Sequence, residues 1–477
     1  MIQTNYIVAI ELSSSKVTGA VGIETINGIK IIATASALVD GYISKGVVRN
    51  VDKTSEAIAD IINRLEHDLT DNDGKEITIK RAYVSLAGLT MHSIQSKVTR
   101  TFDTYTKISA ETISEMELEN DALFQVPDGY SKVHVITQEY KVDGKTDHNP
   151  IGAPAMAIEG RYLNIVIKKQ FLEQLNESFE QVDTVITDSF VAACMDADIL
   201  LTKDARRNGC ALVNIGAETT TVSIYNNDNL RMLKVLPLGS NNITRDLCAE
   251  HISYDAAEVI KITRGYKSQA SETEPISNET ANNIIRARTG EILQNVRFQI
   301  EESGEMIHNV IFTGGGSRLK NLSILLEEYL PNFNTSIVSD PQLAFECKPG
   351  VNTYGIFTTA LYGLLNHGKE NCCEETSNEP QPTTLFPENI MSGNDTPEED
   401  TTTIANEEEE ARREEEQRKK KEEEERKKRE EELKKKKKKE KEQALLNKIR
   451  GFGGLFKEFL QDATSEDEDD DINNEDE

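Results

Sequence analysis

The stretch Cys210-Ala-Leu-Val-Asn-Ile-Gly-Ala-Glu-Thr-Thr-Thr-Val-Ser-Ile-Tyr225 decides the fold of this chain. Apolar runs at residues 210–215 and 220–225 flank a tight turn that starts at Gly216. Short apolar runs on either side of turn residues predict a pair of antiparallel strands. Small side chains and backbone amides in such a turn are suited to surround a phosphate group.

A similar pattern opens the chain. The run 6–12 predicts a buried strand that passes into the turn Glu11-Leu-Ser-Ser-Ser-Lys16. Strands at 17–26 and 29–36 then flank Asn27-Gly28, which is a two-residue hairpin signal. Two blocks that each open with strand, turn and strand indicate a duplicated α/β architecture.

Hydrophobic periodicity predicts the remaining elements. The expected strands are 77–86, 133–142, 164–168, 231–237 and 310–312. The expected helices are 54–69, with Thr54 and Ser55 available as caps, 109–123 and 170–181, and the segments 243–265 and 278–304 are expected to be rich in helix.

A third motif, Thr313-Gly-Gly-Gly-Ser-Arg-Leu319, follows the short strand 310–312 and precedes an expected helix at 320–329. The glycines allow the backbone to approach a flat ligand, and a helix N-terminus offers unpaired N–H donors. Each of the three motifs alone is more often an ordinary hairpin or turn. Their order, two phosphate-type turns and then a glycine-rich loop, is more specific.

On these residues the chain resembles the actin superfamily and, within it, the FtsA family of bacterial cell-division proteins, over residues 1–368. The motifs that carry the resemblance are Lys16-Val17, Gly46-Val-Val48, Pro150-Ile-Gly152, Pro237-Leu-Gly239, Glu258 with Lys261, and Thr313-Gly-Gly-Gly316. It implies a two-lobed actin-like α/β fold with an FtsA-type subdomain 1C inserted in the first lobe.

The resemblance and the composition together give the expected domains. These are 1–83 (subdomain 1A, continued at 167–205 and 341–368), 84–166 (1C), 206–245 (2A, continued at 306–340), 246–305 (2B), 369–443 (disordered and charged linker), 444–463 (amphipathic membrane helix) and 464–477 (acidic tail).

The family pattern implies ATP with Mg in the cleft between the lobes. The residues it places around the nucleotide are Glu11, Ser13, Ser14, Ser15 and Lys16 on one side, Asn214, Gly216, Ala217, Glu218, Thr219 and Thr220 opposite, Glu258 and Lys261 at the ribose, and Gly314, Gly315 and Gly316 at the adenosine.

Departures from the pattern weaken the catalytic part of this implication. Glu11 and Ser13 stand where the family usually has Asp and Gly, Asn214 replaces an Asp, and Glu218 replaces a Gly. Asn brings no charge to a hydrated Mg²⁺, and Glu repels a triphosphate unless it turns outward or meets the metal. We expect weak or absent hydrolysis and assign no catalytic residue; loss of nucleotide binding altogether remains an alternative.

Composition sets the C-terminal region apart. The formal net charge is −29, which argues against a nucleic-acid-binding protein, and residues 369–477 carry about half of this excess. Residues 369–404 are expected to be disordered, and 407–442 form a Glu, Lys and Arg spacer that reaches roughly 50 Å if helical, at ~1.5 Å per residue. Six cysteines without Cys-x-x-Cys spacing indicate reduced thiols and no metal site.

Residues 444–463 predict an interfacial helix, since no stretch has the ~20 apolar residues of a spanning helix. Its apolar face contains Leu445, Leu446, Ile449, Phe452, Leu455, Phe456, Phe459 and Leu460, and Lys448, Arg450 and Lys457 lie off that face. Residues 434–460 hold ten basic and three acidic residues, which suits anionic lipid. Docking of this helix on the globular body or on a partner is the alternative.

The resemblance implies a division protein that tethers FtsZ filaments of the Z ring to the membrane and helps assemble the divisome. The implied partners are the FtsZ C-terminal tail on subdomain 2B, further copies in an ATP-bound filament, other divisome proteins and the anionic cytoplasmic face of the inner membrane at the division site, with no nucleic acid. Alternatives are an assembly protein of another envelope machine, such as the type IV pilus protein PilM, and an actin-fold ATPase acting as a kinase or chaperone.

Phe456→Glu is expected to abolish co-sedimentation of the purified protein with anionic liposomes, because a charge at the centre of the apolar face opposes insertion. Pelleting equal to that of the unchanged protein would contradict a membrane-binding helix.

Overall fold

The structure of the chain, a computed structural model, describes residues 4–26, 28–69, 76–267, 276–338, 346–351 and 358–376. These residues belong to one compact unit, Met1–Glu379. The expected linker, amphipathic helix and acidic tail lie outside the described residues, apart from 369–376. Within the described part of the chain, every helix is too short or too polar to cross a bilayer.

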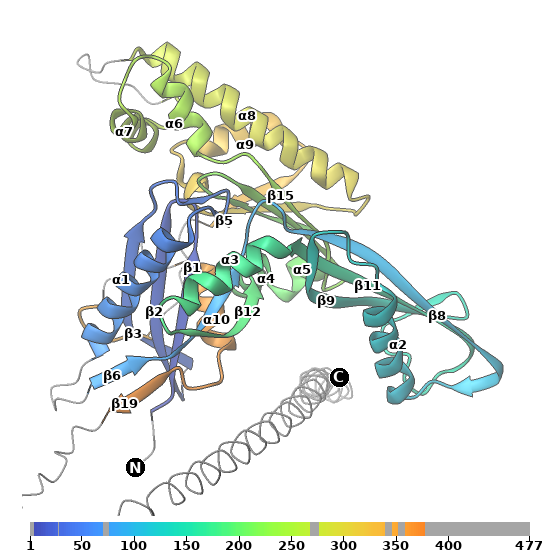
Figure 1. The fold of residues 1–477 in the computed structure, drawn as a ribbon. Helices are drawn as coiled ribbons and strands as arrows, with labels where there is room; N and C mark the ends of the chain where they lie inside the picture. Colours follow the sequence, from blue (N-terminus) through green and yellow to red (C-terminus); the bar gives the residue numbers. More distant parts are fainter. Residues whose placement is uncertain are drawn as a thin grey trace, which may run out of the picture. The chain divides into compact units, whose positions relative to one another are not determined.

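The first sheet has six strands in the order β12-β7-β1-β2-β3-β18 (Figure 1). Their bounds are β1 Tyr6–Leu12, β2 Lys16–Thr25, β3 Gly28–Leu38, β7 Arg81–Leu86, β12 Val185–Val191 and β18 Glu346–Cys347. The predicted pairing of 17–26 with 29–36 is confirmed. The central strand β1 lies between antiparallel β2 and parallel β7, and it is buried along most of its length because helices cover both faces of the sheet.

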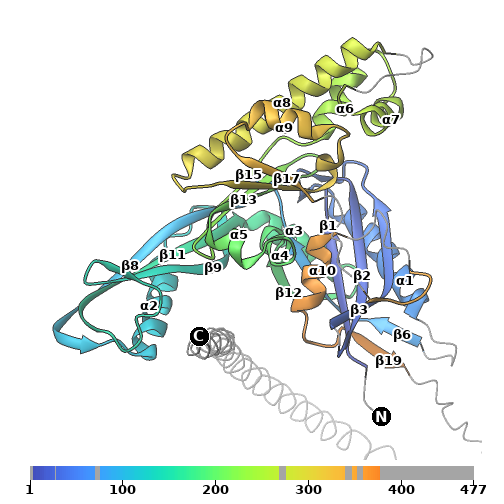
Figure 2. The same cartoon turned by 180° about the vertical axis from the view of Figure 1, so that it is seen from behind.

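Two glycines of β2 permit close packing, one against a helix and one against the neighbouring strand. A Cβ added at Gly19 would lie 2.5 Å from Ile61 of α1 (Val51–Leu69), so this glycine is needed for the approach of α1. One added at Gly22 would lie 2.6 Å from Ile29 of β3 and would be in ordinary contact, at 3.4 Å, with Leu365 of α10 (Thr359–His367). Figure 1 shows α1 in front of the sheet, and Figure 2, seen from behind, shows α10 in front. The same lobe contains α3 Lys169–Glu180, α4 Ala192–Leu200, α5 Lys203–Arg207 and the small hairpin of β4 Ile43–Ser44 with β5 Val47–Val48.

Helix α1 begins three residues before the expected cap. Asn50 caps it, since its Oδ1 accepts from the backbone N of Lys53 at 2.9 Å. Thr54 and Ser55 lie inside the helix, are buried, and donate their hydroxyls to backbone oxygens one turn earlier. The prediction that these two residues cap the helix is therefore wrong.

The second sheet has nine strands in the order β10-β9-β11-β8-β15-β14-β13-β16-β17. The second lobe contributes β13 Cys210–Ile215, β14 Thr220–Asn226, β15 Asn229–Leu236, β16 Asn309–Thr313 and β17 Asn334–Ile337. Strand β13 lies between antiparallel β14 and parallel β16, which repeats the position of β1 in the first sheet. The predicted duplication is confirmed at the level of topology.

The alternation of side chains along β13 joins two hydrophobic cores. Cys210 and Leu212 pack in the core of the first lobe, whereas Ala211, Val213 and Ile215 pack in a second core. Helices α8 Asn278–Glu302 and α9 Leu322–Tyr329 contact strands β14 and β17 of this sheet. Helix α6 Asn241–Cys248 packs on α8, and α7 Tyr254–Arg264 packs on α6 at the outer end of the lobe (Figure 1). The second lobe is therefore packed against the first through its own sheet.

The inserted subdomain follows β7, which stays in the first sheet as far as Leu86. It consists of β8 His92–Lys107, α2 Ala110–Leu123, β9 Tyr130–Val142, β10 Lys145–Asp147 and β11 Pro154–Lys168. Its own small core includes Met116, Ile158 and Tyr162. The predicted helix at 109–123 and strand at 133–142 are confirmed, and Ser109 caps the helix by accepting from the Thr112 amide.

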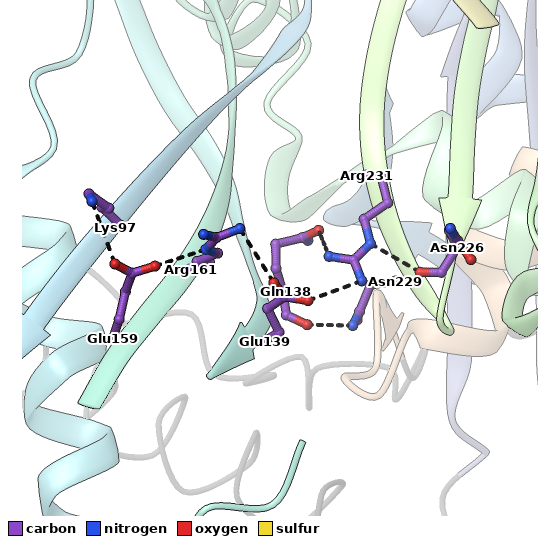
Figure 3. A network of polar contacts seen from close by, with 8 residues as sticks. All are labelled: Lys97, Gln138, Glu139, Glu159, Arg161, Asn226, Asn229 and Arg231. Carbon is purple, nitrogen blue, oxygen red and sulfur yellow. Dashed lines mark hydrogen bonds and ion pairs between the residues drawn. The ribbon is translucent and has the colours of Figure 1, made fainter. Parts of the chain in front are cut away.

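A polar network joins the inserted subdomain to the second lobe (Figure 3). Strand β8 pairs with β15 at His92 and Lys234, which makes the nine-stranded sheet continuous. Gln138 of β9 donates to the backbone oxygen of Leu230 at 2.8 Å and accepts from Arg231 at 3.3 Å. The remaining members are Lys97, Glu139, Glu159, Arg161, Asn226 and Asn229. Because Gln138 is buried, water does not compete for these bonds.

The segment 77–86 is two strands and not the single strand predicted. Strand β6 (Glu76–Ile79) pairs with β19 (Cys373–Thr376) in a separate ribbon, and β7 starts at Arg81 in the first sheet. The chain changes sheet at Lys80, whose amide donates to the backbone oxygen of Cys372. The pairing partner of β6 is almost three hundred residues away, so local periodicity does not reveal the break.

Candidate functional site

The first phosphate-type turn, residues 13–16, is closed by hydrogen bonds within the turn. Ser13 Oγ donates to the backbone oxygen of Lys16 at 2.8 Å and accepts from the Lys16 amide at 3.2 Å. Ser14 Oγ accepts from the amide of Gly46 at 2.8 Å. Ser13 therefore holds the turn between β1 and β2, and Ser14 ties it to the β4–β5 hairpin.

The second turn, residues 216–219, is hydrogen-bonded to the start of α6. The Gly216 amide donates to the Thr219 oxygen at 2.8 Å, which closes the turn between β13 and β14. The Asn241 amide donates to the Ala217 oxygen at 2.8 Å. A Cβ at Gly239 would lie 2.4 Å from that same oxygen, so only glycine fits there.

Glu218 turns away from this loop and reaches the other lobe. Its Oε2 accepts from the hydroxyl of Ser44 at 2.9 Å and from the backbone amide of Lys45 at 2.7 Å. Its Oε1 accepts from Arg245 of α6 at 2.6 Å. From the sequence we expect Glu218 to turn outward or to meet a metal. In the structure it instead forms a contact between the two lobes.

A buried acidic cluster lies beneath the two turns. Asp196 of α4 is 2% exposed; its Oδ2 accepts from Nδ2 of Asn214 at 2.8 Å, and its Oδ1 accepts from the hydroxyl of Thr359. Glu11 accepts from the hydroxyl of Thr358. Burial raises the pKa of both Asp196 and Glu11, against the opposing effect of these hydroxyl donors.

Sequence reasoning selected Glu11 and Asn214 but missed Asp196, Thr358 and Thr359. Asp196 is one of two acidic residues, with Asp198, in the otherwise apolar helix Ala192–Leu200, and only that local contrast signalled it. Its importance comes from contact with residues 18 and 163 positions away.

The glycine-rich loop packs against the second turn. A Cβ at Gly314 would lie 2.3 Å from Oδ1 of Asn214, and one at Gly316 would lie 2.4 Å from Ile215. Gly314 also has a φ of 89°, which favours glycine. At Gly315 an added Cβ would meet nothing within 4 Å, so this backbone is open to a ligand.

The helix expected at 320–329 starts later. The glycines belong to the 3-10 turn Gly315–Arg318, and α9 begins at Leu322 after Asn321 in a left-handed conformation. The glycine loop is therefore not followed directly by a helix N-terminus, and the amides of Ser317 and Leu319 donate to backbone oxygens within the loop.

Glu258 and Lys261 of α7 form an ion pair at 2.7 Å. Glu258 also accepts from the hydroxyl of Thr244, and Lys261 is 6% exposed. The end of α7 contacts the segment after the glycine loop, since the Tyr266 amide donates to the Lys320 oxygen at 3.0 Å. The pair thus lies in the same lobe as the glycine loop, with its charges satisfied internally.

These residues fit a nucleotide better than a metal. The open backbone at Gly315 and the two facing turns suit a flat base and a phosphate chain. Among the described residues, no cluster of three His, Cys, Asp or Glu side chains would hold a metal alone. A magnesium ion would therefore rely on the phosphates and on oxygens such as those of Glu11 and Asn214.

The membrane-facing residues predicted between Leu445 and Leu460 lie outside the described residues.

Comparison with known proteins gives two family matches. A family model described as Cell division protein FtsA matches residues 211–345, and one described as SHS2 domain inserted in FTSA matches residues 88–166. The first match spans β13 to the end of the second sheet, and the second coincides with the inserted subdomain.

Curated relatives carry the same description. The Porphyromonas gingivalis Cell division protein FtsA is 29% identical over 309 residues, covering 60% of this chain and 63% of that protein, which is less than two thirds of its length. The Bacillus subtilis protein of that name is 26% identical over 350 residues, covering 68% and 77%. A solved structure, the PilM-PilN type IV pilus biogenesis complex, matches with TM-score 0.56 at 17% identity, covering 75% of this chain and 97% of that one. At this identity the likeness shows a shared fold alone.

The free energy of unfolding is expected to fall less with rising pH in Glu11→Gln than in the unchanged protein. Because the pKa of Glu11 is raised by folding, the folded state loses stability as pH increases from the unfolded value through the folded one, by about 1.4 kcal/mol for each unit of difference. Gln keeps an oxygen for Thr358 and removes the charge. Urea unfolding at about pH 5 and about pH 8 measures this. The free energy of unfolding of the variant, relative to that of the unchanged protein, should be higher at about pH 8 than at about pH 5.

Glu24→Gln, which removes an exposed carboxyl from the neighbouring strand β2, is the matched control. The same pH dependence in both variants would contradict a special environment at Glu11.

Proposed function

Because the chain belongs to the FtsA family of cell-division proteins, we propose that it tethers FtsZ filaments to the cytoplasmic membrane at the division site and helps assemble the divisome. The observation that carries this proposal is the inserted subdomain between β7 and α3, which matches the FtsA-type SHS2 model over 88–166. It occupies the first lobe of an actin-like fold whose second lobe matches the FtsA model.

The cleft is proposed to bind ATP with Mg and to hydrolyse it weakly or not at all, and the bound form to assemble into filaments. The packing of the glycine loop on Asn214 supports binding, because it brings the second and third motifs together. Asn214 supports weak hydrolysis, since its amide is neutral and its nitrogen is already bonded to Asp196. Steady phosphate release at an ordinary ATPase rate would contradict this part.

Subdomain 2B is proposed to bind the FtsZ C-terminal tail on helix α7. Val259 and Ile262 are 58% and 59% exposed and lie three residues apart on one helix face. Tyr254 at the start of the same helix is 48% exposed. Apolar side chains left uncovered on a short helix suit a peptide that inserts its own apolar residues.

The C-terminal segment is proposed to bind the cytoplasmic face of the inner membrane. Residues 444–463 have the apolar face and basic flank described above, and the charged spacer gives the helix reach. Nine acidic residues at 465–477 oppose anionic lipid, so contact should be reversible and sensitive to salt.

A co-pelleting assay with FtsZ, anionic liposomes and ATP, each omitted in turn, tests the whole proposal. FtsZ should pellet with liposomes only when this protein is present. Phe456→Glu should abolish that effect, and Asn447→Glu, which adds the same charge off the apolar face, should preserve more of it. FtsZ that pellets equally without the protein, or never pellets with it, would contradict the tethering role.

Val259→Asp and Ile262→Asp are each expected to weaken binding of an FtsZ C-terminal peptide about tenfold, since a central apolar contact is worth more than ~1 kcal/mol. Fluorescence anisotropy of a labelled peptide measures this. Asn283→Asp adds the same charge on exposed α8 and serves as control. Unchanged affinity in both α7 variants would place the tail elsewhere.

A further inference from the structure

The tip of the β4–β5 hairpin is a tight turn whose two backbone amides, those of Lys45 and Gly46, both point at acceptors; we call this pair of amides the nest. Lys45 and Gly46 are consecutive residues with φ of 53° and 70°. The Lys45 amide donates to Glu218 at 2.7 Å and the Gly46 amide donates to Ser14 Oγ at 2.8 Å. Successive amides exposed by such a turn form a concave site for negative charge.

The orientation of this tip is fixed by contacts outside the cleft. The Leu89 amide donates to the Lys45 oxygen at 3.0 Å. A Cβ at Gly46 would lie 2.8 Å from the Cα of Gly88, so the two backbones are in close contact. The amides of Lys45 and Gly46 are therefore held toward the cleft by the packing of the first lobe.

Glu218 supplies the anion for this nest. Its side chain is 10% exposed and both carboxylate oxygens are bonded, to Ser44 and Lys45 on one side and to Arg245 on the other. Burial acts to raise the pKa of Glu218, but these donors together lower it below its usual range. The carboxylate is thus ionised at neutral pH.

The contact spans the two lobes beside the first phosphate turn. Ser44 and Lys45 belong to the first lobe, whereas Glu218 lies in the turn between β13 and β14 of the second. Ser14, from the first phosphate turn, occupies the adjacent amide of the same nest. A phosphate between the two turns would meet these donors and would be repelled by the carboxylate.

We propose that Glu218 is a built-in anion that closes the cleft without nucleotide, and that the terminal phosphate of a bound nucleoside triphosphate must displace it. The site consequently favours a nucleoside diphosphate over a triphosphate. This preference rests on the proposed nucleotide binding, whereas closure by Glu218 does not.

Hydrogen–deuterium exchange of residues 43–48 in the nucleotide-free, full-length protein tests closure. Glu218→Ala should accelerate exchange of this segment about tenfold, because the Lys45 amide loses its acceptor. Glu218→Gln keeps an acceptor oxygen, so its exchange rate should lie between those of the unchanged protein and Glu218→Ala. Glu250→Gln removes an exposed carboxyl of the same lobe and should change nothing. Unchanged exchange in Glu218→Ala would overturn the proposal.

Calorimetric titration with MgATP and MgADP tests the preference. Glu218→Ala and Glu218→Gln should raise the affinity for MgATP relative to MgADP by about tenfold, and Glu250→Gln should leave the ratio unchanged. An unchanged ratio in the Glu218 variants overturns displacement by the terminal phosphate. If no variant binds nucleotide, the proposed nucleotide function fails, and exchange of residues 43–48 alone decides whether Glu218 closes the cleft.

Discussion

The arrangement of the second turn and the glycine loop depends on one part-buried hydrogen bond, from Nδ2 of Asn214 to the buried carboxyl of Asp196. Asp196 belongs to a helix of the first lobe and Asn214 to the central strand of the second, so the bond links the two lobes directly. It also orients Oδ1 of Asn214 toward Gly314, which brings the glycine loop against the second turn. A hydrogen bond to a charged group contributes about 1.5–3 kcal/mol, and removing the Asn214 donor leaves Asp196 with the hydroxyl of Thr359 as its side-chain partner.

The parts of the fold that follow from local pattern were predictable. The hairpins around residues 12–17 and 215–220, the helix capped by Ser109 and the duplicated topology all arise from turn residues and periodicity within short windows. The split of 77–86 into β6 and β7 was not predictable, because it depends on pairing with β19 near residue 373. The predicted caps of α1 and the predicted start of α9 were wrong by a few residues. Helix boundaries depend on single hydrogen bonds, such as the one that Asn50 accepts from the Lys53 amide, and periodicity does not reveal these bonds.

The candidate site was predictable in its motifs and incomplete in its partners. The conflict between Glu218 and a phosphate was visible from residue type alone, but its resolution by Ser44 and Lys45 required a contact across 173 residues. The contact between Asp196 and Thr359 likewise exists only after helices α4 and α10 have packed. Turn motifs in the sequence therefore indicate which residues face a ligand. The residues that hold those turns in place are identified only from tertiary contacts.

The continuity of the second sheet through β8 and β15 has a mechanical consequence. Strand β14 starts at Thr220, directly after the second turn, and β15 is its neighbour, so β8 lies two strand spacings, about 10 Å, from β14. A load that pulls on the inserted subdomain is therefore carried by strand hydrogen bonds and by the Gln138–Arg231 network to the edge of the cleft. The chain also connects the inserted subdomain to β7 and α3 of the first lobe, so the same load reaches both lobes and acts on the contacts that join them.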